Sequence, residues 1–285
     1  MVQFQEKEIQ CEDGFVLKAR LFSPEKDKKD TFLIINSATA VGQGLYANYA
    51  TFMAENGFHV LTYDYRGIAE SRPKKLRGFY TSFTDWGEKD VGSVLTYAKE
   101  TYPEFPIYVL GHSIGGTLIG MTSKSNLINK ALTIGAQTAF YKDWGKGRLK
   151  LYVLWHLFFP AVTNLVGYFP GKKLGLLEDV PKGVVQQWHA RRKNPSMVKQ
   201  LESKGINTYF ARYTGDLFTL AISDDTIGTE PGLKRIHDLF ENADKTWETV
   251  RPMGINEKEI GHFGFFRRRF KETLWMKTLK WFETS

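Results

Sequence analysis

Short apolar runs alternate along the chain with longer segments in which apolar residues recur at helical spacing. The apolar runs predict strands at 31–35, 58–63, 107–110 and 131–134. The longer segments predict helices at 46–56, 85–102 and 114–124. Strands that alternate with helices in this way form a mostly parallel sheet with helices on both faces. The pattern therefore predicts an α/β fold whose ligand cleft lies beyond the carboxyl ends of the strands.

The two ends of the chain extend this sheet. Early strands near 2–9 and 15–22 predict an antiparallel hairpin that turns at Asp13-Gly14. Later strands are predicted at 216–222 and 246–250, and a last helix at about 268–282.

The alternation stops after Gln137 and resumes near Asn207. A stretch of this length is too long for a simple crossover loop, so it predicts a lid built from its own helices. The expected organisation is a core in two parts, 1–137 and 206–285, with a helical lid over 138–205 inserted after the sixth strand. The length of 285 residues suits one large domain that carries such an insertion.

The sequence Gly-His-Ser-Ile-Gly-Gly at 111–116 places Ser113 between a predicted strand and a predicted helix. A G-x-S-x-G pattern in this context is typical of a nucleophile elbow, a sharp turn that exposes a reactive serine. Gly111 and Gly115 fit such a turn, because a Cβ atom there would meet the adjoining strand or helix. Ser113 is therefore the candidate nucleophile.

A serine nucleophile needs a base and an acid, and after an elbow of this kind the acid, Asp or Glu, is followed along the chain by the histidine base. Of the six histidines, only His262 lies in a glycine-flanked loop after a late strand, so it is the candidate base. The strand at 216–222 leads into Asp224 and Asp225, and both are candidates for the acid that orients the histidine.

These motifs resemble those of the α/β-hydrolase superfamily over nearly the whole chain. Besides the elbow, the segment Tyr-Asp-Tyr-Arg-Gly-Ile-Ala-Glu-Ser at 63–71 is similar to a motif that follows the fourth strand in that superfamily. The segments 167–172 and 261–267 resemble an uncharacterised predicted-hydrolase branch near the monoglyceride-lipase-like and serine-aminopeptidase-like enzymes. The resemblance implies a catalytic class without a particular substrate.

The resemblance also implies roles for further residues. The order Asp-x-Ile favours Asp225 as the acid, which leaves Asp224 to bind the loop backbone. The backbone amides of Ala38 and Ile114 are the implied donors to an oxyanion, and the hydroxyl of Thr39 is the alternative to Ala38. Many relatives carry His-Gly where this chain has Asn-Ser at 36–37.

Together these residues predict a serine hydrolase that forms an acyl-enzyme intermediate, most simply on carboxylic esters with a lipophilic acyl group. The same site chemistry serves peptidases, amidases and acyltransferases, and the fold also occurs in non-catalytic binding proteins. An intact set of nucleophile, base and acid favours an enzyme with a small-molecule acyl substrate.

Composition and motif content bear on the location, the cofactors and the partners of the protein. The chain has one cysteine, Cys11, and no N-terminal signal pattern, which predicts a reducing, cytoplasmic location. Neither paired Cys/His ligand spacing nor a phosphate-binding loop is present in the sequence, so we expect no metal and no cofactor. Scattered basic clusters without a recognised binding motif argue against nucleic acid as a partner.

The charge of the predicted lid is unusual. Between 138 and 205 there are twelve Lys or Arg and four Asp or Glu, which accounts for the whole net charge of +8. The stretch 151–170 contains no charged residue and is long enough for a membrane span. A membrane span is excluded, however, if both flanking strands stay in one sheet. Apolar lid helices with basic flanks, such as the cluster 146–150, suit peripheral contact with an anionic lipid surface. The alternative is a solvated basic face over an ordinary core.

Overall fold

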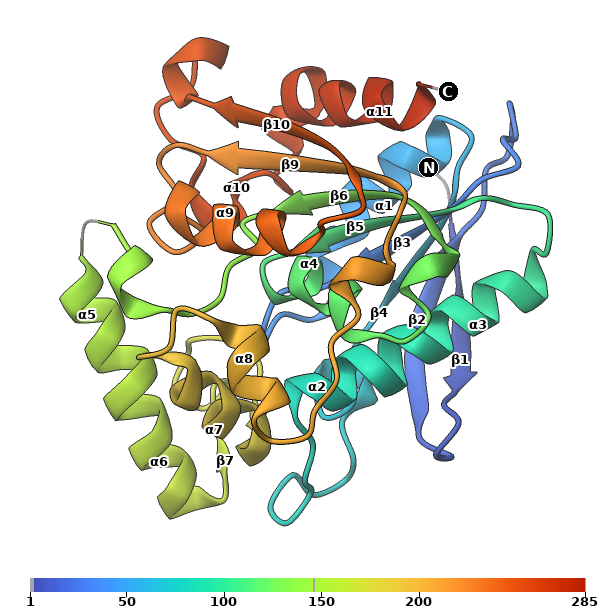
Figure 1. Cartoon of the computed structure of the whole chain (residues 1–285). Helices are drawn as coiled ribbons and strands as arrows, with labels where there is room; N and C mark the ends of the chain where they lie inside the picture. The colour runs from blue at the N-terminus through green and yellow to red at the C-terminus, as the bar shows by residue number, and fades with distance from the viewer. Residues whose placement is uncertain (1–2, 146, 285) are drawn as a thin grey trace.

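A central eight-stranded sheet organises the chain (Figure 1). The computed structural model describes residues 3–145 and 147–284. Along the sheet the strand order is β1-β2-β4-β3-β5-β6-β9-β10. The strands are β1 Phe4–Gln10, β2 Val16–Phe22, β3 Phe32–Asn36, β4 His59–Tyr63, β5 Ile107–His112, β6 Ile128–Ile134, β9 Asp216–Ile222 and β10 Asp244–Val250. Strand β2 pairs antiparallel with β1 and β4, and the remaining pairs are parallel. The predicted α/β-hydrolase sheet and its N-terminal hairpin are confirmed.

Helices cover both faces of the sheet because its inner strands are apolar on both sides. In β3, Phe32 and Ile34 join one core cluster, and Leu33 and Ile35 join the other, as the two-residue period of a strand requires. The first core includes residues of α3 and α4, and the second includes residues of α1 and α11. The helices of the core are α1 Ala47–Glu55, α2 Phe83–Asp85, α3 Gly92–Thr101, α4 Ile114–Leu118, α9 Glu230–Leu239, α10 Gly261–Gly264 and α11 Met276–Glu283.

The helix after the elbow is shorter than its sequence predicts. The sequence predicts a helix over 114–124, but α4 ends at Leu118 and a 3-10 turn follows over Ile119–Met121. The segment that leads into β9 lies against this turn. The Tyr209 amide donates to the Gly120 carbonyl at 2.8 Å, and a Cβ atom on Gly120 would lie 2.1 Å from the Phe210 ring. A distant segment therefore takes the place of the next helical turn.

The segment between β6 and β9 is an insertion that contains several helices. Its elements are α5 Arg148–Val153, α6 Phe159–Val166, β7 Tyr168–Phe169, β8 Val180–Pro181, α7 Lys182–Arg191 and α8 Met197–Glu202. A π-helical segment, Leu154–Phe158, joins α5 to α6, so that 148–166 forms one continuous helix. The helices of the insertion group together at the lower left of Figure 1. The core sheet resumes with β9 at Asp216, where the sequence predicts this strand. Lys146, which belongs to the predicted basic cluster, lies outside the described residues.

Candidate active site

Ser113 occupies the sharp turn between β5 and α4. Its backbone has φ 54° and ψ −121°, a conformation that residues with a side chain rarely adopt. The turn is tight enough to require glycine on both sides. A Cβ atom on Gly111 would lie 2.4 Å from Gly116 Cα, and one on Gly115 would lie 2.2 Å from the Asn36 carbonyl oxygen. The structure thus has the elbow geometry that the sequence predicts.

His262 and Asp225 form a close, buried pair. His262 Nδ1 lies 2.7 Å from Asp225 Oδ2, and the two side chains are 7% and 1% exposed. Gly135 packs against this pair, because a Cβ atom there would lie 2.9 Å from His262 Cε1 and 3.2 Å from Asp225 Oδ2. The preceding residue, Ile134, accepts a hydrogen bond from the Ser113 amide at 2.8 Å. Ser113, after β5, and Asp225, after β9, therefore flank the end of β6, and His262, from the turn after β10, packs against Asp225 there.

The carboxylate of Asp225 is held in its charged form. Its Oδ1 atom accepts hydrogen bonds from the amides of Ile227 and Gly228, both at 2.8 Å. Burial acts to raise the pKa of Asp225, but the adjacent His262 and these amides outweigh it and hold the pKa below its usual value. A charged Asp225 favours the His262 tautomer with a proton on Nδ1, which leaves Nε2 free to accept a proton.

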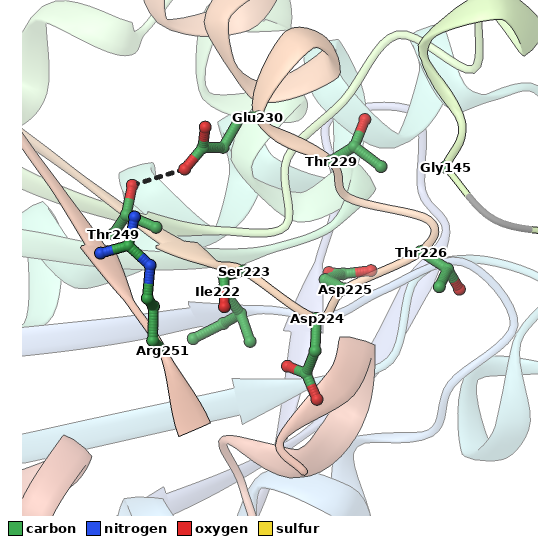
Figure 2. A pocket seen from close by; sticks show the side chains of 10 residues that line it. All are labelled: Gly145, Ile222, Ser223, Asp224, Asp225, Thr226, Thr229, Glu230, Thr249 and Arg251. Carbon is green, nitrogen blue, oxygen red and sulfur yellow. Dashed lines mark hydrogen bonds between the residues drawn. The ribbon is translucent and has the colours of Figure 1, made fainter. Parts of the chain in front are cut away.

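Asp224 makes a different set of contacts. Its carboxylate accepts hydrogen bonds from the amides of Ile260 at 2.9 Å and Gly261 at 3.1 Å. Figure 2 shows the two adjacent carboxylates directed to different sides of the loop. The predicted backbone-binding role of Asp224 is confirmed. Ser113 and His262 are not among the residues that line the cleft of about 610 Å³ beside these aspartates.

His262 lies in a helical turn, whereas the sequence predicts a loop. The turn is α10, Gly261–Gly264, and Gly261 begins it with φ +63°. The first amides of a helical turn have no partner within it. Asp224 supplies that partner from the neighbouring loop, which explains how so short a turn forms next to His262.

A series of hydrogen bonds links the loop after β3 to the backbone of His262. No sequence pattern indicates it. The Ala38 amide donates to the Tyr46 hydroxyl at 2.7 Å, and that hydroxyl lies 3.0 Å from His112 Nδ1. His112 Nε2 lies 2.9 Å from the His262 carbonyl oxygen. Because a carbonyl only accepts, His112 carries its proton on Nε2 and accepts the Tyr46 proton at Nδ1. The residue before the serine thus holds the backbone of His262.

These contacts correct one predicted role. The family resemblance implies that Ala38 donates its amide to an oxyanion, but its single amide hydrogen is already bonded to Tyr46. The Thr39 hydroxyl, the alternative, is buried and has no partner within the described part of the chain. Ile114 occupies the first position of α4, where helix amides have no intrahelical acceptor. Thr39 and Ile114 therefore remain the predicted donors.

Two acidic groups near the site are structural. Asp64 accepts hydrogen bonds from the amides of Gln43 at 2.7 Å and Glu70 at 3.1 Å, and burial raises its pKa to about 6. The second, Asp90, is fully buried and pairs with Arg66. Within residues 3–145 and 147–284, no group of three His, Cys, Asp or Glu side chains is placed to hold a metal ion.

The buried His112 predicts a loss of stability in mild acid. Burial, together with the neighbouring His262, lowers the pKa of His112 to about 3. The unfolded chain binds a proton at this residue below about pH 6.5, whereas the folded chain does not. The contribution of His112 is therefore complete above pH 6.5 and is lost as the pH falls toward 3.

We expect His112 to reduce the free energy of unfolding by about 2 kcal/mol between pH 6.5 and pH 5, at about 1.4 kcal/mol per pH unit. Urea unfolding at the two pH values measures this change. In His112→Gln the decrease over the same interval should be smaller by this amount. An unchanged pH dependence in the variant would contradict the assignment.

The chain resembles known proteins in sequence and in structure. Residues 29–131 match a family model described as serine aminopeptidase, S33. A search of curated proteins finds no match. Similar solved structures include an esterase from Pyrococcus furiosus, with 15% identity, a TM-score of 0.62, and 99% of this chain and 92% of that chain covered. A thermostable carboxyl esterase from Bacillus coagulans has 12% identity and a TM-score of 0.66, with 99% and 98% covered.

A third similar structure is a Xanthomonas campestris protein described as a serine hydrolase without a lid, with 11% identity and a TM-score of 0.57. The match covers 99% of this chain and 97% of that chain. Together these matches show that the chain has an α/β-hydrolase fold, as its motifs predict. Over residues 29–131, the closer similarity is to the serine aminopeptidase family, which lies near the predicted branch.

Proposed function

We propose that this protein is a serine hydrolase that cleaves carboxylic esters through an acyl-enzyme. Ser113 attacks the ester carbonyl while His262 accepts its proton at Nε2. Asp225 holds the imidazole in place and stabilises its charged form. The Ile114 amide and the Thr39 hydroxyl stabilise the oxyanion of the tetrahedral intermediate. His262 returns the proton to the departing alcohol, and a water molecule, activated by the same histidine, then attacks the acyl-enzyme and releases the acid.

One observation carries this proposal. Ser113 has φ 54° at the start of α4, and in the neighbouring loops His262 lies 2.7 Å from the buried carboxylate of Asp225. Backbone strain of this kind persists only where the surrounding structure enforces it, and it is concentrated at functional sites. A protein that only binds a ligand needs neither the strained serine nor the oriented histidine.

The preference for a lipophilic acyl group rests on the insertion. The segment after β6 packs on the elbow helix, where the Thr117 hydroxyl donates to the Gln137 carbonyl at 3.5 Å. Immediately beyond it, Ala139 and Trp144 form an apolar cluster with Trp188 of α7, within the insertion. Aromatic side chains supply large apolar surfaces for an acyl chain. Two of the similar structures are esterases by description, which agrees with this substrate class.

The competing functions differ in measurable ways. A peptidase or amidase would cleave an anilide at a rate comparable with the matching ester. An acyltransferase would favour an added alcohol or amine over water as acceptor. A non-catalytic binding protein would not react with a fluorophosphonate, which labels activated serines only. The serine-aminopeptidase similarity over 29–131 makes the amide comparison necessary.

Labelling and a substrate series test the proposal directly. The purified protein should react with a fluorophosphonate probe and should hydrolyse p-nitrophenyl esters, with kcat/KM rising from acetate toward medium chain lengths. The corresponding p-nitroanilides should react far more slowly. Absence of both labelling and ester turnover would refute the hydrolase assignment. Equal rates on esters and anilides would favour the amidase.

The oxyanion donor is tested at Thr39. Its buried hydroxyl has no partner among the described residues, so Thr39→Val should leave the thermal midpoint nearly unchanged. If the hydroxyl donates to the oxyanion, kcat for an activated ester should fall about 10²-fold. Thr39→Ser, which keeps the hydroxyl, is the control and should retain most of the activity. Full activity in the valine variant would leave the oxyanion to backbone amides alone.

A further inference from the structure

The long helix of the insertion exposes apolar side chains on its outer face. Along 148–166 the exposed fractions are 74% for Leu149, 45% for Val153, 54% for Leu157 and 84% for Leu165. With the exposed Ala161 between the last two, they are spaced by four residues, so each lies next to the following one along the helix surface. We call these five residues the outer stripe.

The opposite face of the same helix is fixed to the protein. The Phe159 ring stacks on Phe169 with 3.7 Å between centroids, and the Trp155 and Trp188 rings lie 5.4 Å apart. His156 and Thr163 are fully or almost fully buried on this side. The helix is therefore held in place by its inner face, and the exposure of the outer stripe does not result from a detached segment.

A surface helix of a soluble protein normally presents polar and charged residues to water. Here no acidic residue occurs between Arg148 and Val166, and only 17% of the most apolar window is buried. A row of exposed apolar side chains of this length is more typical of an interaction surface than of a surface that only faces water.

Cations lie at both ends of the outer stripe. Arg148 and Lys150 are exposed at its beginning. At its other end, the exposed Arg77 lies against Gly167, the residue that follows the helix, since a Cβ atom on Gly167 would lie 2.9 Å from Arg77 Cγ. An apolar stripe bordered by basic residues matches the boundary between acyl chains and anionic headgroups, where both kinds of side chain are stabilised.

We infer that the outer stripe binds the surface of an anionic lipid bilayer, with the helix lying in the plane of the interface. By its length and composition alone, the helix could span a membrane. However, its inner face is packed against the protein, and the chain returns to the core sheet on both sides. Flat binding buries the outer stripe without breaking those contacts. This inference concerns binding and is independent of the proposed hydrolysis.

Cosedimentation of the full-length protein with vesicles tests the inference. We expect binding to vesicles of equal parts phosphatidylglycerol and phosphatidylcholine, and much weaker binding to phosphatidylcholine alone or at about 0.5 M salt. The double variant Leu157→Ser/Leu165→Ser should weaken binding roughly tenfold per leucine. The double variant Arg148→Gln/Lys150→Gln should weaken it roughly fivefold per residue on anionic vesicles only.

Matched controls show whether the outer stripe itself carries the binding. Met253, 89% exposed in the turn after β10, is an apolar site outside the insertion, and Met253→Ser should bind like the wild type. Hydrolysis of a short soluble ester by the leucine variant should be unchanged. Equal binding to neutral and anionic vesicles, or binding to neither, would overturn the inference. A dimer in solution that the leucine variant abolishes, without vesicle binding, would instead assign the outer stripe to a second copy of the chain.

Discussion

Ser113→Ala should abolish fluorophosphonate labelling and lower ester hydrolysis by roughly 10⁴-fold or more. The substitution removes the only atom proposed to attack the carbonyl, and serines of this kind carry most of the rate enhancement of their enzymes. The thermal midpoint should hardly change. Alanine keeps the Cβ atom, so the strained backbone at φ 54° is no less favourable than in the wild type.

Labelling followed by mass spectrometry of the modified peptide and steady-state kinetics with a short p-nitrophenyl ester measure both effects. Ser203→Ala is a suitable control, because its exposed hydroxyl bonds only locally, to the Gln200 carbonyl at 2.9 Å. The control should be labelled and active like the wild type. Labelling that persists in Ser113→Ala would move the nucleophile elsewhere.

Asp225→Asn should lower kcat by about 10³- to 10⁴-fold while the protein remains folded. The amide cannot stabilise the imidazolium, and its NH₂ group favours the wrong tautomer of His262, which lies 2.7 Å away. The two backbone amides that donate to Asp225 can still bond to the remaining oxygen. The loss should therefore appear in the rate and not in the thermal midpoint.

Asp224→Asn is the matched comparison, because the two aspartates are adjacent and differ in their partners. Asp224 binds the amides at the start of α10, so its substitution should disturb the position of His262 only indirectly. We expect a loss of activity at least roughly tenfold smaller than for Asp225→Asn. Circular dichroism and kinetics on both variants decide the question. The reverse ranking would assign the acid to Asp224.

The parts of the protein that depend on local patterns were predictable. Buried parallel strands such as β3 and β5 are continuous apolar runs, because both faces of the sheet are covered. The elbow was visible because a tight turn admits glycine alone at Gly111 and Gly115. The convergence of serine, aspartate and histidine follows from the sheet, since parallel strands bring their carboxyl ends to one edge.

Two kinds of feature escaped prediction because they depend on residues far apart in the chain. The length of α4 depends on Phe210, which packs against Gly120 from another segment. The availability of the Ala38 amide depends on the Tyr46 hydroxyl, and thereby on His112 and the backbone of His262. Neither contact leaves a pattern in the residues around it.

The sequence by itself determined the α/β sheet, the helical insertion, the elbow at Ser113 and the excess of positive charge between 138 and 205. Those properties follow from periodicity, glycine positions and composition, which are local. Only the tertiary structure decided which aspartate meets His262, which amide is already bonded, and which face of the insertion helix remains exposed. Each of these depends on distances of a few ångströms between segments that the fold, and no local pattern, brings together.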